Sequence, residues 1–546
     1  MQKQMKWPLI LFAIGVFMAA LDNGIITSSL TTLNASFGVS PTWGAWTITL
    51  YTLGLAVSVP IAGKLSDRYG RKKLFLIEVA LFGIGSLLVA LSTSFTFFLI
   101  ARVVQALGGG GIFIIASSYV LSKFPAERQG TALGLLGGMN GVAAILGPNI
   151  GAFILDITGN WHWLFLINVP IAILLFIAGI RYIHEEQELS RKAVDWSGIA
   201  VMTLGVLSLM YSFSNLDGVN MLQSLGSPMF YGFFLAGVVI LVLFYFLEKR
   251  LEGSQREPVV STQLLGIASF RWTLLIAFFS GAILASVIFI PGFVEQYLGV
   301  SNTASGYWFT PLALASGIGA GGGGYLVDRK GPIWTLSVAG LLSAIGFLLF
   351  PLWVEHIWQF VIASVLVGIG FGMMLGAPVN VLVTEQAGEN NKGIAVATSS
   401  LFRQMAMAIA PTIFAGFLAR SFSNLGSNIQ QGLTDQGIQV PPEALQQYAS
   451  GGGAASGSDI SSLTEGLSQI PDPGIRDVLL QALHQTIGEG YSGLFWSAVI
   501  FSVLTLVAAF ITGRQRHKEK RNRVETASTN GMDGHSTSRE QCTFCQ

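Results

Sequence analysis

The sequence predicts an all-α membrane protein in which fourteen spanning helices form two six-helix halves, with two further helices inserted between them. Composition is the first reason. Hydrophobic residues make up 52% of the 546 residues and charged residues only 11%, whereas soluble domains carry about 25% charged residues. So few charges cannot cover a water-facing surface, but a lipid-facing surface needs none. The other two reasons are a series of long apolar runs and an internal repeat.

Each apolar run is long enough to cross a bilayer as a helix, which needs about 20 residues. The predicted spans are 7–28, 43–62, 74–92, 96–118, 130–155, 161–183, 196–213, 229–247, 270–294, 304–326, 333–353, 356–382, 393–420 and 491–513. We expect the first run to be a retained helix, because no small-residue cleavage site follows it cleanly. Barrel strands are disfavoured, because they alternate with a period of two over short segments.

Basic residues indicate the orientation of these spans. An even number of spans places both termini on one side, and placing them in the cytoplasm leaves 26 of the 30 Lys and Arg residues on that side. Arg420 and Arg476 then lie outside, and Arg102 and Arg403 lie within spans. We therefore expect a multi-pass plasma-membrane protein with both termini in the cytoplasm. The net charge of +1 gives no indication of nucleic-acid binding.

An internal repeat relates the two ends of the chain. The stretch GKLSDRYGRKK from Gly63 and the stretch GYLVDRKGPIW from Gly324 share five residues at a constant offset of 261. IARVVQALGGG in the fourth span matches IASVLVGIGFG in the twelfth at an offset of 262, and Pro148 and Pro411 lie 263 apart. Three matches at nearly one offset indicate two parallel six-helix halves with the substrate path between them.

The chain accordingly divides into six parts. These are an N-terminal six-helix half at 1–184, an inserted transmembrane hairpin at 185–260, the first five helices of the C-terminal half at 261–420, an extracellular loop at 421–490, the last transmembrane helix at 491–513 and a disordered cytoplasmic tail at 514–546. Within the loop, IRDVLLQALHQTI has apolar residues at helical spacing and predicts an amphipathic helix. Cys542 and Cys545 in the tail cannot close a metal site alone, so we expect no metal.

Asp22 lies near the middle of the first span and is the residue best placed to carry a proton. A carboxylate in the membrane interior is costly, and binding a proton removes that cost. Arg102 lies within the fourth span, and Gln105 follows three residues later on the same helix face. We expect the three to form a proton-coupling site, with a purely structural buried pair as the alternative.

Five stretches carry a resemblance to a known family. GKLSDRYGRKK is similar to the signature cytoplasmic loop of the major facilitator superfamily, LIARVVQALGGGG to its Arg–Gln motif, and NGVAAILGPNIGAF to the motif typical of its antiporters. ALDNGI in the first span and WHWLFLINVPI in the sixth resemble the fourteen-helix drug:proton antiporter family of the QacA and EmrB type. The resemblance covers 1–420 and 491–513. It departs from the family where 161–163 reads Trp-His-Trp instead of Trp-Arg-Trp, and where 23–25 reads Asn-Gly-Ile instead of Thr-Ile-Val.

The resemblance implies that the signature loop is a gating latch between the halves. Its candidate residues are Gly63, Asp67, Arg68, Gly70, Arg71 and Lys72. The glycines permit close helix contact and a tight turn, and the aspartate can accept hydrogen bonds from backbone donors at a neighbouring helix N-terminus. The basic residues hold the loop in the cytoplasm and can pair with acids or lipid phosphates. A topology signal alone is the alternative.

The antiporter motif places Gly141, Gly147, Pro148 and Gly151 on the fifth span. Proline removes a helix hydrogen bond and small residues admit close packing, so we expect a flat, kinked face there. The resemblance implies a seal against leak, and plain helix packing is the alternative.

Aromatic and methionine side chains could form an adaptable apolar pocket for flat cations or lipophilic compounds. The substrate-path candidates are Trp46, Tyr51, Asn140, Phe279, Phe289, Tyr307, Phe309, Arg403 and Met405. Tryptophan and tyrosine near span ends can equally be interface anchors. Asn168 can line a path or bridge helices, and Glu78 near the end of the third span can pair with the basic loop.

These features favour a proton-coupled antiporter that exports lipophilic or cationic drugs or toxic compounds across a bacterial plasma membrane by alternating access. Export of lipids or lipid-linked precursors, and a non-transporting membrane receptor or scaffold, are the alternatives. The sequence has no P-loop, HExxH or GxSxG motif, so we expect neither an enzyme nor a cofactor, with the proton gradient as energy source. The expected partners are small lipophilic or cationic substrates and membrane lipids, with a monomeric protein and no nucleic acid.

Overall fold

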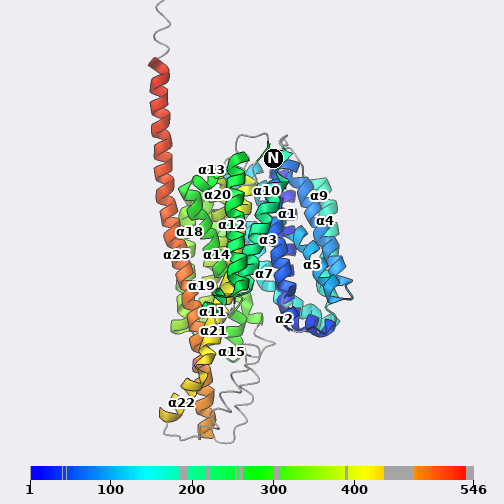
Figure 1. Ribbon diagram of the computed structural model, residues 1–546, viewed down its shortest axis with the longest axis vertical. Coiled ribbons are helices and arrows are strands. Elements are labelled where there is room, and N and C mark those ends of the chain that lie inside the picture. The colour runs from blue at the N-terminus through cyan, green and yellow to red at the C-terminus, as the bar shows by residue number, and fades with distance from the viewer. Residues whose placement is uncertain are drawn as a thin grey trace, which may run out of the picture.

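The structure, a computed structural model, describes residues 2–39, 41–44, 46–184, 193–216, 221–251, 256–257, 262–300, 306–387, 392–435 and 473–536. The described chain is almost entirely helical, and its long helices run side by side along one direction (Figure 1). The N terminus lies at one end of this bundle, which we call the N-terminal end, and α2 and α22 lie at the opposite end, which we call the far end.

The first half of the bundle is built from residues 2–182. Its helices are α1 (Gln2–Phe37), α2 (Pro41–Gly44), α3 (Trp46–Tyr69), α4 (Arg71–Ala90), α5 (Phe95–Gly109), α6 (Ile112–Lys123), α7 (Ala126–Thr158), α8 (His162–Leu166) and α9 (Asn168–Tyr182). α5 and α6 are two parts of one span, and so are α8 and α9. This half therefore contains six helical segments at the positions of the six predicted spans, and two of these segments are each made of two consecutive helices.

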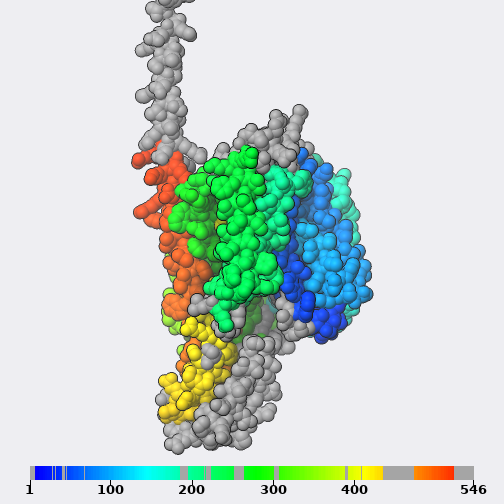
Figure 2. All heavy atoms as spheres, viewed as in Figure 1, coloured from blue at the N-terminus to red at the C-terminus, as the bar shows by residue number. Residues whose placement is uncertain are grey.

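The inserted segment forms a helical hairpin between the halves. It contains α10 (Trp196–Ser214), α11 (Met221–Leu225) and α12 (Pro228–Leu251). Two-residue strands, β1 (Ala193–Val194) and β2 (Arg256–Glu257), pair in parallel beside it. α10 packs against α3 of the first half and α21 of the second, and α12 packs on α10 and forms part of the surface between the two halves in Figure 2. The hairpin thus lies over one seam between the halves.

The second half is built from residues 262–536. Its elements are α13 (Thr262–Gly266), α14 (Ala268–Val287), α15 (Ile290–Gln296), η1 (Gly306–Phe309), α17 (Thr310–Lys330), α18 (Pro332–Trp353), α19 (Ile357–Leu375), α20 (Pro378–Ala387), α21 (Lys392–Ser423), α22 (Leu425–Asp435) and α25 (Pro473–Ser536). α22 and the first turns of α25 extend beyond the bundle at the far end, where Leu425, Ile429 and Leu433 are buried against α25.

Twelve described helices are long and apolar enough to cross a membrane, or thirteen when the bent helix α7 is counted as one span. The predicted number of fourteen therefore stays a prediction. The remaining predicted span, 304–326, corresponds to η1 and α17. α17 is a full helix of 21 residues, but its run of glycines and its charged last turn lower its hydropathy.

Two predicted boundaries were wrong. The last helix does not begin at 491 but at Pro473, because the predicted amphipathic segment continues directly into it as one helix. The predicted disorder from 514 is also contradicted up to Ser536, since α25 continues to that residue. Lysine, arginine and glutamate favour helix once a preceding helix has nucleated it. The remainder of the predicted loop, 436–472, and the segment 537–546 lie outside the described residues.

The halves meet mainly at two helix pairs, α7 with α17 and α3 with α21. Glycines bring these backbones close together. A Cβ at Gly63 would lie 2.6 Å from the Cβ of Ala397, and a Cβ at Gly134 would lie 2.5 Å from the carbonyl oxygen of Ala320. Small residues at such contacts let helices approach without side chains between them.

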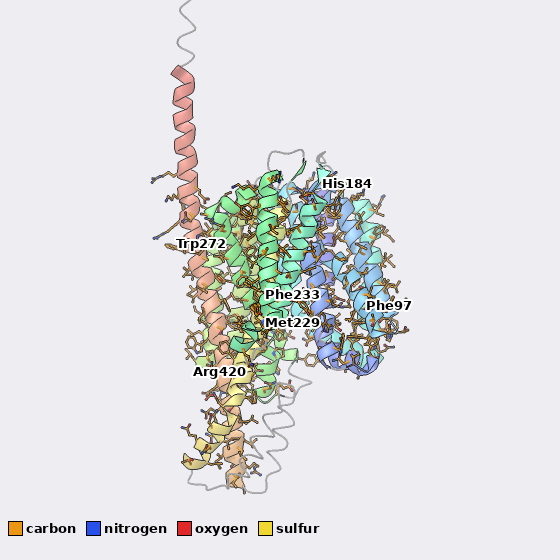
Figure 3. The ribbon with its side chains drawn as sticks, in the orientation of Figure 1. Phe97, His184, Met229, Phe233, Trp272 and Arg420 are labelled. Atoms are coloured by element: carbon orange, nitrogen blue, oxygen red, sulfur yellow. The ribbon has the colours of Figure 1, made fainter. Side chains whose placement is uncertain are left out.

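Large apolar side chains cover the outside of the bundle. Phe97 on α5 is 42% exposed, and Met229 and Phe233 on α12 are 50% and 42% exposed (Figure 3). Exposed apolar surface on this scale is suited to lipid.

Candidate functional site

Asp22, Arg102 and Gln105 form a closed hydrogen-bonded cluster inside the first half. Arg102 Nη1 donates to Asp22 Oδ2 at 2.6 Å and to Gln105 Oε1 at 2.6 Å, and Gln105 Nε2 donates to Asp22 Oδ1 at 2.8 Å. All three residues are 0% exposed. The structure thus brings together the three residues that the sequence pointed to, with the acid on α1 and its partners one turn apart on α5.

Two further polar side chains complete the cluster. Gln105 Nε2 also donates to Ser86 Oγ on α4 at 2.8 Å, and Asn168 Nδ2, at the start of α9, donates to Asp22 Oδ1 at 3.2 Å. The cluster therefore joins four helices, and two of them, α5 and α9, donate to the carboxylate of Asp22 on α1. The sequence indicated that Asn168 can line a path or bridge helices, and it bridges α9 and α1. Ser86 was missed, because a serine in an apolar helix usually bonds its own backbone.

Aromatic rings cover the guanidinium of Arg102. Its Cζ lies 3.9 Å from the centre of the Tyr51 ring and 5.6 Å from that of Phe165, within cation–π range. Its Nε and Nη2 make no hydrogen bond to any described residue. Arg102 therefore depends on Asp22 for charge balance, and a proton on Asp22 would leave a buried cation without its counter-ion. The ring of Tyr51, a residue predicted for the substrate path, thus packs over the guanidinium of the Asp22–Arg102 pair.

The antiporter motif lies beside the cluster on α7. This helix bends by 45° between Ala144 and Leu146, where Pro148 has no N–H to donate to the carbonyl of Ala144. At the bend, a Cβ at Gly24 would lie 2.7 Å from the carbonyl oxygen of Ala144 and 2.7 Å from Gly147 Cα. The departure from the family at Gly24 therefore has a packing reason, since α1 and α7 touch by their backbones two residues from Asp22.

The other two glycines of the motif occupy different surroundings. A Cβ at Gly141 would lie 3.2 Å from Ser316 Oγ of α17, so Gly141 lies at the contact between the halves. Gly151 is buried within the first half.

The signature loop lies at the N-terminal end, between α3 and α4. Gly70 has φ +93°, a conformation essentially restricted to glycine. Arg71 donates to Ser118 Oγ and Ser122 Oγ of α6, each at 2.8 Å, and Lys72 donates to the carbonyl oxygen of Ile180 at 2.8 Å. Arg68 lies over the ring of Tyr69. The side chain of Asp67 lies outside the described residues.

The second copy of the loop makes the contact that was expected of Asp67. Asp328, its counterpart in the repeat, accepts hydrogen bonds from Gly130 N at 2.7 Å, Thr131 N at 2.8 Å and Thr131 Oγ1 at 2.6 Å. These donors lie in the second turn of α7, so the carboxylate of one half holds a helix of the other half at the N-terminal end. Sequence reasoning found the repeat but did not select Asp328, although the offset of 261 would have identified it.

Two of the remaining aromatic substrate-path candidates, Phe279 and Phe289, are joined through the rings of Phe501 and Phe414, which lie 6.4 Å apart, whereas Trp46 contacts a ring of α10. Their ring-to-ring distances are 6.3 Å for Trp46 and Tyr211 of α10, 6.2 Å for Phe279 and Phe501, and 6.0 Å for Phe289 and Phe414. Tyr307 is 65% exposed, whereas Phe309 is buried. The part of these residues in a substrate path stays a prediction.

Asn140, Arg403 and Met405 are half-buried. Arg403 Nε is enclosed without a hydrogen-bond partner among the described residues. Those residues also include no group of three or more His, Cys, Asp or Glu side chains that could hold a metal ion.

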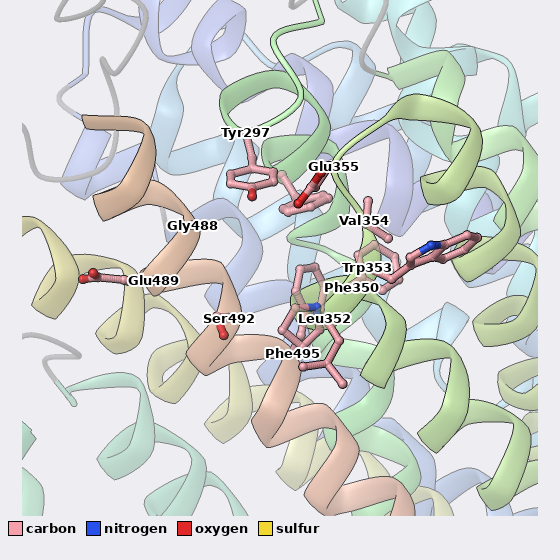
Figure 4. Close-up of a pocket in the computed structure, with 12 residues that line it drawn as sticks. Tyr297, Phe350, Leu352, Trp353, Val354, Glu355, Gly488, Glu489, Ser492 and Phe495 are labelled. Carbon is pink, nitrogen blue, oxygen red and sulfur yellow. The ribbon is translucent and has the colours of Figure 1, made fainter. Parts of the chain in front are cut away.

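A cavity of 390 Å³ lies at the far end, between α15, α18 and α25 (Figure 4). Phe350, Phe495, Tyr297 and Glu355 are among its lining residues. Burial and the nearby Glu355 charge raise the pKa of the Tyr297 hydroxyl. Neither the residues of the Asp22 cluster nor the predicted substrate-path residues are among those that line this cavity.

Comparison with known proteins gives consistent matches. The Major Facilitator Superfamily profile matches residues 12–411. The chain is similar to the uncharacterized MFS-type transporter YfiU of Bacillus subtilis (strain 168), with 54% identity over 95% of this chain and 98% of that protein. It is also similar to multidrug resistance protein 3 of the same organism, with 29% identity over 95% and 97% of the two chains. Among solved structures, the human organic anion transporter MFSD10 shares the fold, with a TM-score of 0.58 and 14% identity over 91% and 99% of the chains.

Proposed function

The chain belongs to the major facilitator superfamily, and we propose that it is a proton-coupled antiporter that exports lipophilic or cationic compounds across the plasma membrane. The observation that carries this proposal is the buried pair of Asp22 and Arg102, 2.6 Å apart and closed off from solvent. A scaffold that only packs helices has little use for such a pair, because apolar residues would fill the same space at lower cost. The similarity to multidrug resistance protein 3 supports the substrate class.

The charges of this cluster explain how a proton and a cationic substrate could exclude one another. With Asp22 ionised, the pair is neutral and its surroundings tolerate a substrate cation. A proton on Asp22 frees the charge of Arg102, which repels a cation in a medium of low dielectric constant. Proton binding from outside would thus favour substrate release there, and loss of the proton to the cytoplasm would restore the pair.

The contacts between the halves supply the alternating part of the cycle. The side chain of Asp328 and the close helix contacts at Gly63 and Gly134 hold the N-terminal end closed, and these contacts can separate without unfolding either half. We assign the N-terminal end to the cytoplasm, because 26 of the 30 basic residues fall on that side when both termini are cytoplasmic.

Transport in liposomes tests this function. Purified protein is reconstituted, a pH gradient is imposed, and the movement of lipophilic cationic dyes is followed. Dye movement should require the gradient, and Asp22→Asn should abolish the effect of the gradient. Asp477→Asn, which changes an acid that is 72% exposed, is the matched control and should transport like the unchanged protein. Full gradient-driven transport by Asp22→Asn would contradict the proposal.

A further inference from the structure

The fourth span is broken at a run of glycines. α5 ends at Gly109 and α6 begins at Ile112, within the sequence ALGGGG at 106–111. Gly110 N still donates to the carbonyl oxygen of Ala106 at 3.1 Å, but the next helical bond, from Gly111 N to the carbonyl of Leu107, is not formed. Glycine weakens a helix by its backbone freedom, so the break occurs where the helix is weakest.

Two side chains from other helices replace this missing bond. Glu78 Oε2 of α4 accepts a hydrogen bond from Gly111 N at 3.1 Å, and Ser58 Oγ of α3 donates to the carbonyl oxygen of Leu107 at 2.7 Å. Both halves of the broken backbone bond are thus satisfied, one by a hydroxyl and the other by a group that can bind a proton. The sequence suggested instead that Glu78 would pair with the basic loop, and the structure shows no such ion pair among the described residues.

Glu78 is buried, with only 6% of its surface exposed. Charged or titratable groups occur on the elements that pack against α4, and on α4 itself. Those with described side chains are Lys64, Arg68, Tyr51 and Tyr69 on α3; Arg71, Lys72 and Lys73 on α4; Arg102 on α5; Tyr119 and Lys123 on α6; His162 on α8; and Arg181 and Tyr182 on α9. None of them forms an ion pair with Glu78 in the described structure. A carboxylate so enclosed is costly, and a bound proton removes the cost.

The break lies between the Asp22 cluster and the contact of the halves. Ser86, which joins the cluster, lies eight residues from Glu78 on α4, or about 12 Å along the helix axis. On the other side of the break, α6 reaches the second half, where Lys392 Nζ donates to the carbonyl oxygen of Leu121 at 2.9 Å. A change of angle at Gly110 and Gly111 would therefore move α6 relative to α21 while α5 keeps its cluster.

We propose that Glu78 is a second proton-binding carboxyl, and that the proton it binds changes the break between α5 and α6. The ionised carboxylate accepts the Gly111 N–H and holds the break open. Once protonated, it is a weaker acceptor, and the N–H can return to the carbonyl of Leu107, which restores the helical bond between α5 and α6. This inference deepens the proposed function and rests on it for the source of the proton.

Infrared difference spectra of the purified full chain between high and low pH test proton binding directly. The unchanged protein should show carbonyl bands of buried carboxyl groups, and Glu78→Gln should lose one of them. The same loss is expected in an Asp22→Asn background, so the test remains valid if Asp22 is not the coupling residue. Ser58→Ala alters the other half of the break without a titratable group and should keep the band. Identical spectra with and without Glu78→Gln would overturn the proposal.

Distances between spin labels test the change in the break. With Cys542 and Cys545 replaced by serine, labels at Ile100 on α5 and Lys123 on α6 should show a pH-dependent shift that Glu78→Gln abolishes. If Glu78→Gln does not fold, Glu78→Asp keeps the titratable group but shortens its reach to Gly111, and should retain the band while reducing the shift. A shift that persists unchanged in the folded variant would overturn the coupling of proton to break.

Discussion

Removing one member of the buried pair should destabilise the protein far more than removing both. In Asp22→Asn, Arg102 keeps its charge with 0% exposure, one hydrogen bond to Gln105 and two nitrogens without partners. Breaking a buried pair in this way costs about 3–5 kcal/mol, because an uncompensated charge remains. Arg102→Gln leaves the opposite charge on Asp22, whose remaining donors are the amides of Gln105 and Asn168, and should cost a similar amount.

The double variant, Asp22→Asn with Arg102→Gln, replaces the two charges by neutral amides that can hydrogen-bond. Additive effects would give about 6–10 kcal/mol, but we expect only about 1–3 kcal/mol, because neutral replacements of buried pairs are often tolerated. Unfolding of the purified protein in a denaturing detergent series, followed by tryptophan fluorescence, measures the four free energies of unfolding. A double variant destabilised by the sum of the two single effects would refute the coupling between these charges.

Three further predictions concern contacts between helices. Asp328→Ala removes three hydrogen bonds across the halves, each worth about 1.5–3 kcal/mol for a charged acceptor, and should open the N-terminal end. Thiol labelling of cysteines introduced at that end should rise more than tenfold, and Thr131→Val, which removes one of the bonds, should give an intermediate rise. Unchanged labelling would contradict this role of Asp328. Gly24→Ala should destabilise the protein by about 1–3 kcal/mol, because the added methyl group overpacks the contact between α1 and α7. Gly321→Ala, where a Cβ meets open space, should not destabilise it, so equal melting temperatures of the two variants would refute the close contact. Glu519→Gln weakens the hydrogen bonds that Glu519 accepts from Ser269 N at 3.1 Å and from Ser269 Oγ at 2.6 Å. Because these bonds hold the end of α25, limited proteolysis should cleave the variant faster after residue 513, and an unchanged rate would contradict this role.

The sequence by itself determined the class of the protein, the positions of most spans and the identity of the central acid. Hydropathy requires a local run of residues and nothing else, so thirteen of the predicted spans correspond to helices that satisfy the length and composition of a span. The bend at Pro148 was also predictable, because a missing N–H is a property of the residue itself. Asp22, Arg102 and Gln105 stood out because ionisable and amide groups are costly in an apolar helix.

Tertiary structure alone decided which groups these residues meet. Ser86 joins the cluster and Gly24 contacts Gly147 only because α4 and α7 have a particular depth and rotation relative to α1 and α5. In the same way, Glu78 meets the amide of Gly111 instead of a cation of the basic loop. The periodicity of a helix determines the face on which a side chain lies. A hydrogen bond between two helices also requires that they pack together to within a fraction of an ångström, and the sequence of one segment does not determine that packing.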